Sequence, residues 1–421
     1  MKYRIVIVGG GAGGLELATR LGTAFGGNTK VNVTLVDSNL THIWKPLFHE
    51  VAAGSLNTGT DEVNYLAQAR WSGFAFQHGQ LTKLCRTEKL ITLKDPFSNA
   101  TRTLAYDTLV ISVGSLSNDF GTLGVQEHCL FLDSRTQAER LQKKLLQRHL
   151  RSHAETVATP LRIAIVGAGA TGVELSAELH HAMVLINSYG MCNSDRQSLH
   201  VSLIEAAPRV LPALNERISD RVTRSLKEMG VSVRTSVAVK EVTENGLTFV
   251  DGSSLDADFK IWAAGIRAPA FLKELDGLEV NRINQLVVRP TLQSSFDDNI
   301  FALGDCAACP MPGEDKKFVP PRAQAANQQA KFLASSLQKV VAGRALPEFV
   351  YRDKGTLISL ASFNAVGVIG REKLTQGRVA RLLYRSLYRA HQGVLFGVNR
   401  TLLKISSEML QRKTKPRLRL H

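Results

Sequence analysis

Two stretches of the chain share one order of apolar, glycine-rich and amphipathic segments. The stretch "RIVIVGGGAGGLELATRL" begins at Arg4, and "RIAIVGAGATGVELSAEL" begins at Arg162. In each stretch, a continuous apolar run predicts a buried strand, and the pattern after the glycines predicts a helix. A strand, a glycine turn and a helix that recur in this order predict an α/β fold with two similar units.

Three further apolar segments predict strands and indicate how the two units are connected. "YDTLVISVGS" (106–115) and "FKIWAAGIRAP" (259–269) both run into a glycine, as expected where the chain crosses between domains. "DDNIFALGDCA" (297–307) ends in a Gly-Asp pair, and we expect it to return to the first unit. The second unit is then an insertion. The expected ranges are residues 1–115 and 290–345 for the first unit, 116–289 for the second, and 346–421 for a C-terminal region.

The C-terminal region contains a segment with an apolar face and a basic stripe. In residues 378–394, "RVARLLYRSLYRAHQGV", apolar residues at three- and four-residue steps lie near one face of a helix. These apolar residues are Val379, Leu382, Leu383, Leu387, Ala390 and Val394, and the arginines beside them are Arg378, Arg381, Arg385 and Arg389. The pattern is typical of a helix in a membrane interface. A helix packed on the body of the protein would show it as well.

The charge of the chain is concentrated in the same region. The protein has 421 residues and a formal net charge of +15. Residues 371–421 contain thirteen Lys or Arg against two Asp or Glu, a net charge of +11, and the first 370 residues carry the remaining +4. Such an excess of positive charge would serve to bind nucleic acid, to bind acidic lipid, or only to keep the protein soluble. No stretch of 18 apolar residues occurs, so we expect no membrane-spanning helix.

The N-terminal segment and the cysteines point to a reducing compartment. The first apolar segment begins at Tyr3 and leads directly into a glycine turn, so we interpret it as a strand and not as a secretory signal. Five cysteines form no disulfide framework. Cys306 and Cys309 form a single C-x-x-C pair without a second pair or a His pair, so we expect a structural role and no metal site.

Each glycine turn has the spacing G-x-G-x-x-G. The first glycine permits a tight turn, the second lets a pyrophosphate approach the backbone, and the third lets the helix pack closely on the strand. Phosphate oxygens would then lie against the free N–H groups at the start of the helix. The glycines are Gly9, Gly11 and Gly14 in the first unit, and Gly167, Gly169 and Gly172 in the second.

An acidic residue ends the strand that follows each turn. Asp37 lies 23 residues after Gly14, and Glu205 lies 33 residues after Gly172 because a longer loop precedes its strand. A carboxylate in this place binds a free ribose 2′-hydroxyl and disfavours a 2′-phosphate. The pattern therefore favours FAD and NADH as the two dinucleotides, while Arg209 leaves NADPH as a weaker alternative.

The Gly-Asp pair decides which unit holds which dinucleotide. In flavin reductases with two dinucleotide folds, a pair such as Gly304-Asp305 contacts the ribityl and phosphate part of the flavin. Because this segment is expected to return to the first unit, we assign FAD to the first glycine turn and NADH to the second.

The segment "HIWKPLFHE" (42–50) follows the first acidic residue and carries several polar groups. Related disulfide reductases have a cysteine pair in this region, and this chain has none, so thiol chemistry is excluded there. Lys45 would favour an anionic reduced flavin if it lay near the ring, and otherwise it is a surface lysine. His42 and His49 are candidates for a proton relay or for structural roles.

Together these strings resemble the type II NADH:quinone oxidoreductases, the single-subunit respiratory NADH dehydrogenases of bacteria that do not pump protons. The resemblance covers nearly the whole chain and includes "VGGGAGGLELAT", "THIWKPLFHEVAAGSL", "AIVGAGATGVELSAELH", "WAAGIRAP", "ALGDCA" and "VPPRAQAANQQA". It implies two Rossmann-like domains of the glutathione-reductase type with a C-terminal membrane-attachment region. It also implies non-covalent FAD, NADH as donor, ubiquinone or menaquinone as acceptor, and peripheral attachment to the cytoplasmic face of the inner cell membrane.

The resemblance implies roles for the residues whose motifs match. The first glycine set, Asp37 and Asp305 match FAD contacts of the family, and the second glycine set and Glu205 match its NADH contacts. Gln324 and Gln328, in "RAQAANQQ", match glutamines that line the quinone pocket. Two amides four residues apart share a helix face and suit the neutral carbonyls of a quinone, although a polar helix face would have the same pattern.

Glu174 matches a carboxylate of the family near the nicotinamide and the flavin. It lies two residues after Gly172, in the first turn of the predicted helix. There it would either orient the nicotinamide or relay a proton, or it would only complement the helix dipole, which contributes about 0.3–1 kcal/mol. Glu16 holds the same place in the first unit, which favours the structural role.

Three other functions are alternatives to this one. A soluble flavin reductase that serves a ferredoxin-like protein would share both dinucleotide folds. A redox sensor with a DNA-binding tail would explain the charge, but no nucleic-acid-reading element is recognisable, and we expect no nucleic-acid partner. A sulfide:quinone oxidoreductase needs cysteines that this chain does not evidently supply. The basic tail favours an anionic lipid surface, and its apolar residues would also serve a homodimer.

Overall fold

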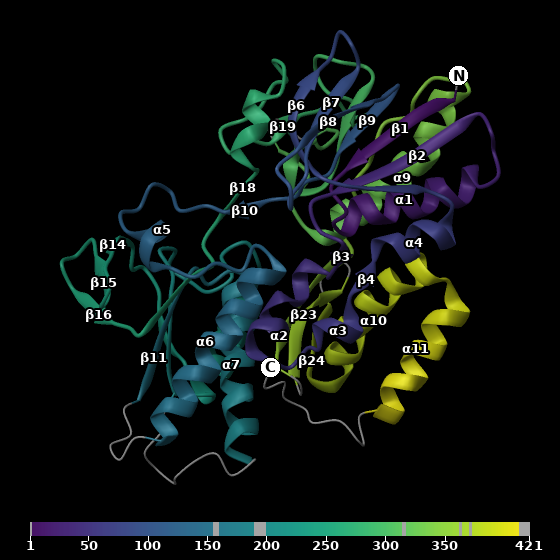
Figure 1. The fold of residues 1–421 in the computed structure, drawn as a ribbon. Helices are drawn as coiled ribbons and strands as arrows, with labels where there is room; N and C mark the ends of the chain where they lie inside the picture. Colours follow the sequence, from purple (N-terminus) through teal and green to yellow (C-terminus); the bar gives the residue numbers. More distant parts are fainter. Residues whose placement is uncertain are drawn as a thin grey trace.

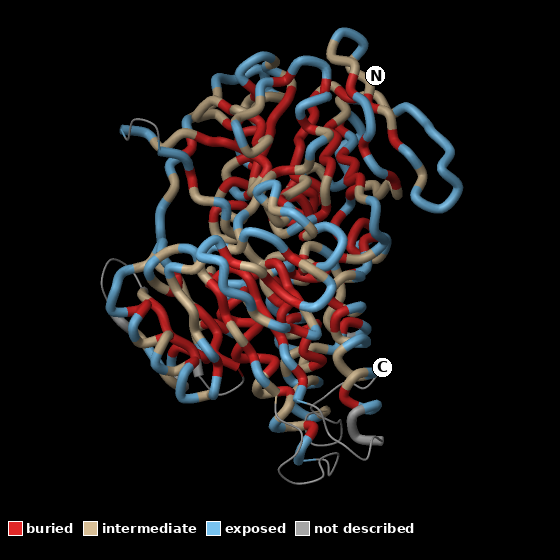
Figure 2. Tube along the Cα trace, turned by 90° about the vertical axis from the view of Figure 1, so that its left-hand side faces the viewer, coloured by how far each residue is buried: buried red, intermediate tan, exposed pale blue. Residues whose placement is uncertain are grey.

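The computed structural model describes residues 2–154, 160–188, 199–313, 317–361, 364–369 and 373–411. Figure 1 shows two α/β units, one above the other, with the C-terminal helices beside them. Figure 2 shows the buried chain gathered in an upper and a lower region, so each unit has a core of its own. The expected α/β fold class with two similar units is confirmed.

The first unit is built on a parallel sheet of five strands in the order β20-β9-β1-β2-β5. Its strands are β1 (Tyr3–Val8), β2 (Val31–Asp37), β5 (Ala75–His78), β9 (Thr108–Ile111) and β20 (Ile300–Ala302). Its helices are α1 (Ala12–Phe25), α4 (Tyr65–Ser72) and α9 (Ala323–Val341). An antiparallel sheet stands beside it, formed by β6 (Gln80–Cys85), β7 (Leu90–Lys94) and β8 (Thr101–Ala105). Because β20 pairs with β9, the chain returns to this sheet as expected.

The second unit repeats the plan with a parallel sheet of four strands in the order β13-β12-β11-β17. Its strands are β11 (Leu161–Val166), β12 (Leu199–Ile204), β13 (Ser232–Arg234) and β17 (Phe259–Trp262). Its helices are α6 (Arg135–Ala154), α7 (Ala170–Ser188) and α8 (Glu216–Glu228). An antiparallel sheet of β14 (Val239–Val242), β15 (Gly246–Phe249) and β16 (Ser254–Asp256) lies beside it. The loop that lengthens the spacing to Glu205 falls largely on residues 189–198, outside the described residues.

Short elements connect the units and shape the region between them. Two antiparallel strands, β10 (Leu116–Ser117) and β18 (Ile266–Arg267), form the crossing. Helix α2 (Phe48–Ala53) belongs to the first unit in sequence, yet its residues pack in the second core against α6 and α7. The other short elements are β3 (Thr41–His42), η1 (Lys45–Leu47), α3 (Thr58–Asp61), β4 (Val63–Asn64), α5 (Val125–His128), η2 (Ala270–Glu274), β19 (Leu286–Val287), η3 (Gly304–Cys306) and β21 (Ala307–Ala308).

The structure differs from the expected ranges at two boundaries. Ala268, Leu272 and Leu286 are buried in the first core, so the chain re-enters that unit well before residue 290. The reason is that the chain packs on the first core as soon as it has crossed back along β18. Phe349 is buried there too, although the C-terminal region was expected to begin at residue 346.

The C-terminal region is a small sheet followed by two helices. The sheet consists of β22 (Gly355–Leu360), β23 (Asn364–Ile369) and β24 (Lys373–Gln376), and it packs on α7 and α8 of the second unit. The helices are α10 (Gly377–Phe396) and α11 (Val398–Gln411). The amphipathic part is therefore confined to these helices, and the cationic segment after Gln411 lies outside the described residues.

Candidate functional site

The two glycine turns have the same backbone geometry. Gly9 and Gly167 have φ angles of +100° and +102°, in the left-handed region that favours glycine. A Cβ on Gly9 would lie 2.3 Å from the carbonyl oxygen of Ser112, which closes this position to any side chain. A Cβ on Gly14 would lie 1.9 Å from the Gly9 carbonyl oxygen, and one on Gly172 would lie 1.9 Å from that of Gly167. The folded chain itself therefore requires glycine at the first and third positions.

The middle glycines stand in a different environment. A Cβ on Gly11 or on Gly169 would meet no atom of the described chain within 4 Å. The fold therefore gives no steric reason for glycine at these two positions. A pyrophosphate that approaches the backbone supplies one, because a side chain would stand in its place. Each turn thus fits the phosphates of a dinucleotide.

The two acidic residues are held against their turns in the same way. Asp37 Oδ2 accepts a hydrogen bond from the Gly10 N–H at 2.6 Å, and Glu205 Oε2 accepts one from the Ala168 N–H at 2.7 Å. The other oxygen of each accepts a backbone N–H two residues further along the chain, at 2.7 Å for Asp37 and 2.9 Å for Glu205. The longer spacing before Glu205 therefore leaves its position unchanged. Each acid lies at the end of its strand beside the turn, where a ribose would bind.

The Gly-Asp pair lies beside the first turn, as the connection of β20 predicts. Asp305 Oδ2 accepts a hydrogen bond from Ser115 Oγ at 2.8 Å, and Gly304 N–H donates to Gln329 Oε1 at 2.7 Å. Leu303, just before the pair, lies against Gly13 of helix α1. Three segments that are far apart in sequence therefore meet at the first glycine turn.

Lys45 contacts the segment of the chain that crosses from the first unit to the second. Its Nζ donates a hydrogen bond to the Ser115 carbonyl oxygen at 2.6 Å and lies 3.7 Å from Asp133 Oδ1. Asp133 in turn accepts a hydrogen bond from the Ser117 N–H at 2.9 Å. Ser115 also donates a hydrogen bond to Asp305, so Ser115 connects Lys45 with the Gly-Asp pair. Lys45 is thus a partnered side chain at the junction of the two units.

Glu174 and its counterpart Glu16 differ in their partners. Glu16 pairs with Arg20 on its own helix at 2.8 Å. Glu174 is buried, and its Oε1 accepts a hydrogen bond from the Ser359 N–H at 2.9 Å, while Oε2 lies 3.5 Å from His49 Nδ1. Burial raises the pKa of Glu174 to about 8. A contribution to the helix dipole alone does not explain these long-range contacts.

A cluster of buried charged groups surrounds Glu174, and sequence reasoning missed most of it. Glu50 and Glu178 lie close to it, and Ser55 Oγ donates a hydrogen bond to Glu178 Oε1 at 2.6 Å. Burial and the neighbouring Glu178 raise the pKa of Glu50. The spacing of Glu174 and Glu178, four residues apart on one helix face, was a signal that could have been used.

Arg381 corrects one expectation about the C-terminal helix. It was expected in a basic stripe beside the apolar face, but it is buried and points into the cluster. Its guanidinium donates a hydrogen bond to Ser359 Oγ and lies 3.8 Å from Glu50 Oε1. Arg389, another arginine of the expected stripe, pairs with Glu408 of α11. Arg381 therefore turns toward the acidic cluster instead of the solvent.

Replacement of Glu174 by Gln should make stability less dependent on pH. Because the folded-state pKa of Glu174 is raised from 4.5 to about 8, folding favours its protonated form. The stability that this group contributes is present below pH 4.5 and is lost as the pH rises towards 8. Between these values, wild-type stability should fall relative to the variant. Thermal unfolding from pH 5 to 8 measures this, and parallel curves for the two proteins would contradict the raised pKa.

An aromatic cluster lies where the segment 42–47 meets helix α10. The Trp44 ring stacks on Tyr388 and on His391, with centroid distances of 5.5 and 5.9 Å. The His42 and His391 rings meet edge to face at 5.6 Å. Trp44 Nε1, His42 Nε2 and both ring nitrogens of His391 are buried without a hydrogen-bond partner among the described residues. Burial lowers the pKa of His42 to about 3 and that of His391 to about 4, so both rings are neutral at pH 7.

Gln324 and Gln328 use their amides to hold a segment of the chain. Gln324 Oε1 accepts a hydrogen bond from the Lys354 N–H at 2.8 Å, and its Nε2 donates to the Gly355 carbonyl oxygen at 3.0 Å. Gln328 binds the N–H and the carbonyl oxygen of Arg352 in the same manner, at 3.1 and 2.8 Å. The two amides thus lie on one face of α9, as expected, and their partners are backbone groups.

The cysteines near the Gly-Asp pair are buried thiols. Burial raises the pKa of Cys306 and of Cys309 to about 12, so neither is a thiolate at pH 7. Among the described residues, no three His, Cys, Asp or Glu side chains gather as ligands of a metal ion do.

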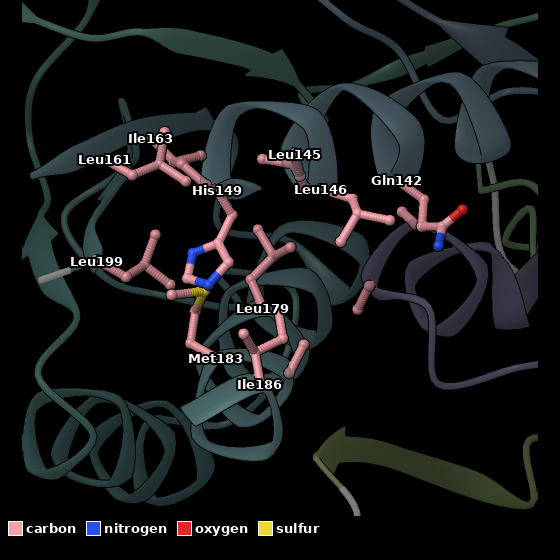
Figure 3. Close-up of a pocket in the computed structure, with 13 residues that line it drawn as sticks. Gln142, Leu145, Leu146, His149, Leu161, Ile163, Leu179, Met183, Ile186 and Leu199 are labelled. Carbon is pink, nitrogen blue, oxygen red and sulfur yellow. The ribbon is translucent and has the colours of Figure 1, made fainter. Parts of the chain in front are cut away.

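A small apolar cavity of about 40 Å³ lies in the second unit, between α6, α7 and the strands β11 and β12 (Figure 3). Its polar lining residues are Gln142 and His149. None of the residues that bind or surround the glycine turns lines this cavity, so it takes no part in the candidate site.

No helix within the described ranges is both long and apolar enough to cross a bilayer. The apolar residues expected on one face of α10 are largely exposed, with Val379, Leu382 and Leu387 among them. The face that packs on the protein is formed by other residues, among them Ala380, Tyr384 and His391.

Comparison with known proteins agrees with this geometry. The sequence model of the pyridine nucleotide-disulphide oxidoreductase family matches residues 3–330. A type II NADH:quinone oxidoreductase of Haemophilus influenzae is 45% identical over 443 aligned positions, which cover 99% of each chain. The enzyme of that name from Staphylococcus aureus is 29% identical and covers 87% of this chain and 90% of its own length.

Solved structures share the fold. NDH2 from Plasmodium falciparum, in complex with NADH, superimposes with a TM-score of 0.84 over 99% of both chains at 20% identity. A sulfide:quinone oxidoreductase from Aquifex aeolicus gives a TM-score of 0.74 at 18% identity, covering 98% of this chain and 96% of its own. With two acid-anchored glycine turns and a relative that matches from end to end, the chain belongs to the pyridine nucleotide-disulphide oxidoreductases, and among them to the type II NADH:quinone oxidoreductases.

Proposed function

We propose that this protein oxidises NADH with a non-covalently bound FAD and passes two electrons to a membrane quinone, without pumping protons. The observation that carries the proposal is the open space at the middle glycines, Gly11 and Gly169, beside turns anchored by acidic residues. One turn would receive the pyrophosphate of FAD and the other that of NADH. The Haemophilus influenzae relative bears this activity in its name.

In this proposal each unit holds one dinucleotide. The FAD unit consists of residues 1–115 and of the returning chain from Ala268 to about residue 345, and the NADH unit is inserted between them. Asp37 and the Gly304-Asp305 pair would bind the two ends of FAD. Glu205 would bind the ribose of NADH.

Bound FAD supplies the chemistry of accepting a hydride and releasing electrons singly or in pairs. The chain contributes position and a dry environment. Lys45, held by Ser115 and Asp133, would lie beside the flavin and favour its reduced anion. Glu174, buried and fixed by Ser359, would orient the nicotinamide. The neutral carboxyl that its raised pKa implies can donate a hydrogen bond at pH 7.

The quinone would bind at the aromatic cluster of Trp44 and His391. Buried N–H groups without partners are costly, at about 1–3 kcal/mol each, and the carbonyl oxygens of a quinone can accept their hydrogen bonds. Gln324 and Gln328 would then form the wall of this site by holding the chain at residues 352–355. Either ubiquinone or menaquinone satisfies these contacts.

The exposed apolar side chains of α10 and α11 would lie in the interface of an anionic bilayer. The net charge of +11 on residues 371–421 favours anionic headgroups. We place the protein at the cytoplasmic face of the cell membrane as a peripheral protein, where NADH is available. A homodimer through the same helices is the competing arrangement.

Anaerobic stopped-flow spectroscopy of the purified yellow protein tests the proposal. NADH should bleach the flavin band, and a short-chain ubiquinone added afterwards should restore it quickly. Bleaching followed by slow reoxidation would point to a soluble protein acceptor. If NADH does not bleach the flavin, the assignment of NADH to the second glycine turn fails.

Selectivity for NADH should depend on Glu205. Combined replacement of Glu205 by Gln and of the exposed Ala206 by Arg removes the repulsion of a 2′-phosphate and adds a cation near it. The ratio of kcat/KM for NADPH to that for NADH should rise about tenfold, which corresponds to about 1.4 kcal/mol. Steady-state rates with both donors measure this ratio. The single variant Ala206→Arg is the control, and an unchanged ratio in the double variant would remove Glu205 from the ribose site.

A further inference from the structure

Helix α4 of the first unit exposes a stripe of residues typical of a membrane interface. Its exposed residues include Leu66 and Arg70, which lie four residues apart on one face, and Trp71, which follows Arg70 near the end of the helix. The relative exposure of Leu66 is 59% and that of Trp71 is 56%. Trp44 and Trp262, in contrast, are buried at 7% and 3%. Trp71 is therefore the exposed member of the three tryptophans in the chain.

The stripe is attached to the C-terminal helices by two contacts. Gln68, a buried residue of α4, donates a hydrogen bond through Nε2 to the carbonyl oxygen of Leu395 near the end of α10, at 2.6 Å. On the outer side, the guanidinium carbon of Arg400 on α11 lies 4.7 Å from the centroid of a Trp71 ring. Figure 1 shows α4 directly above the turn between α10 and α11. Helix α4 therefore continues the surface of the two C-terminal helices.

These helices carry a high concentration of exposed apolar side chains. The members on α11 are Val398, Leu402, Leu403, Met409 and Leu410, and those on α10 are Val379, Leu382 and Leu387. Large exposed apolar areas mark surfaces that bind a partner or a membrane. Tryptophan and arginine side by side suit the headgroup region, because the indole is amphipathic and the cation meets lipid phosphates.

We propose that α4 is part of the lipid-contacting surface, with Trp71 and Leu66 inserted at the headgroup level and Arg70 and Arg400 against anionic phosphates. The inference rests on the proposed membrane attachment and extends it to the dinucleotide-binding unit itself. The protein would then be held by two elements that lie more than 300 residues apart in sequence, α4 and α11. Two separate anchoring elements fix the orientation of a rigid body on a surface, whereas one helix pair leaves it free to tilt.

Charge favours lipid over a second copy of the chain at this surface. Arg70, Arg385 and Arg400 are all exposed on the three helices, and a twofold contact would bring like charges together. An anionic bilayer meets the same cations with opposite charge.

Tryptophan fluorescence of the FAD-loaded protein tests the proposal directly. The vesicles contain phosphatidylglycerol and phosphatidylethanolamine with bromine on the acyl chains, and sedimentation measures the bound fraction. Bromine quenches indole at short range, so binding should lower the emission in wild type and in Trp262→Phe. The variant Trp71→Phe should sediment with the vesicles and lose this quenching.

The outcomes separate this inference from the proposed attachment. If wild type does not sediment with vesicles, membrane attachment itself fails. If it sediments and its emission is unquenched, attachment stands and the role of α4 is wrong. A blue shift of Trp71 emission that rises with protein concentration in the absence of lipid would assign the surface to a second copy, which also overturns the inference.

A matched pair of surface variants gives a second measurement. Removal of the apolar groups in Leu66→Ser/Trp71→Ser should weaken vesicle partitioning by about tenfold or more, because two large side chains no longer leave water. Phe97→Ser, which changes a side chain exposed at 77% in the turn between β7 and β8, should leave partitioning unchanged. Equal partitioning of the two variants would contradict the proposal.

Discussion

Replacement of Gly11 by Val should give a folded protein that does not retain FAD. The Cβ of residue 11 would meet no atom of the chain within 4 Å, so the fold does not oppose the substitution. A pyrophosphate at the first turn would meet the valine side chain instead. We expect FAD affinity to fall roughly 100-fold, or about 2.8 kcal/mol. The flavin content after gel filtration and the thermal midpoint of the apoprotein measure the two effects separately.

The second turn should respond in the same way with a different ligand. Gly169→Val should keep its flavin and lose NADH binding, since Gly169 also faces open space. Gly172→Ala is the contrasting control: its Cβ would lie 1.9 Å from the Gly167 carbonyl oxygen, so the loss should appear as instability. If Gly169→Val bleaches with NADH as wild type does, no pyrophosphate binds at that turn.

Replacement of Arg381 by Met should lower the free energy of unfolding by about 1–3 kcal/mol, because Ser359 Oγ loses a buried hydrogen-bond partner and Glu50 loses its neighbouring cation. Arg381 contacts Glu50 and Ser359, and Ser359 in turn holds Glu174. Urea unfolding of the two proteins at pH 7 measures the difference.

Two further variants sharpen this prediction. Arg385→Met changes an exposed arginine one turn further along α10 whose charge also acts on Glu50, and because this charge is exposed to water its effect should be smaller, at about 0.5 kcal/mol. The double variant Arg381→Met/Glu50→Gln should recover part of the loss, since it removes a carboxylate together with its cation. Equal stability of Arg381→Met and Arg385→Met would show that Arg381 does not compensate the buried acids. A loss that is specific to Arg381→Met would weaken any test that removes the C-terminal helices, because such a truncation deletes Arg381 as well.

Features that depend on local sequence could be predicted well. The strands, glycine turns and acids follow from short patterns, and the contacts of Asp37 and Glu205 are the same in the structure. The Gly304-Asp305 pair was also placed beside the first unit, because a parallel strand that returns to the sheet ends at the same edge as its neighbours. Their roles toward FAD and NADH stay predictions.

Features that depend on distant contacts could not be read from the sequence. Arg381 lies in a helix with two plausible faces, and its contacts with the acids Glu50 and Glu174, far away in sequence, decide which face turns inward. The chain returns to the first unit at Ala268 because it packs on the core of that unit. The spacing of motifs along the sequence does not show which residues form this core. For the same reason the hydrogen bonds of Gln324 and Gln328 to the chain at residues 352–355 were not expected, and the role of both residues beside a quinone stays a prediction.

The place of Arg381 in the chain has a consequence for biosynthesis. The acids on which its charge acts, Glu50 and Glu174, are synthesised early, and the arginine follows about 200 residues after Glu174. At about 5–20 residues per second this interval lasts on the order of 10–40 s. During that time these acids lack the neighbouring cation, so we expect them to stay hydrated or protonated. We therefore expect the packing around Glu174 to be completed only after α10 has been synthesised.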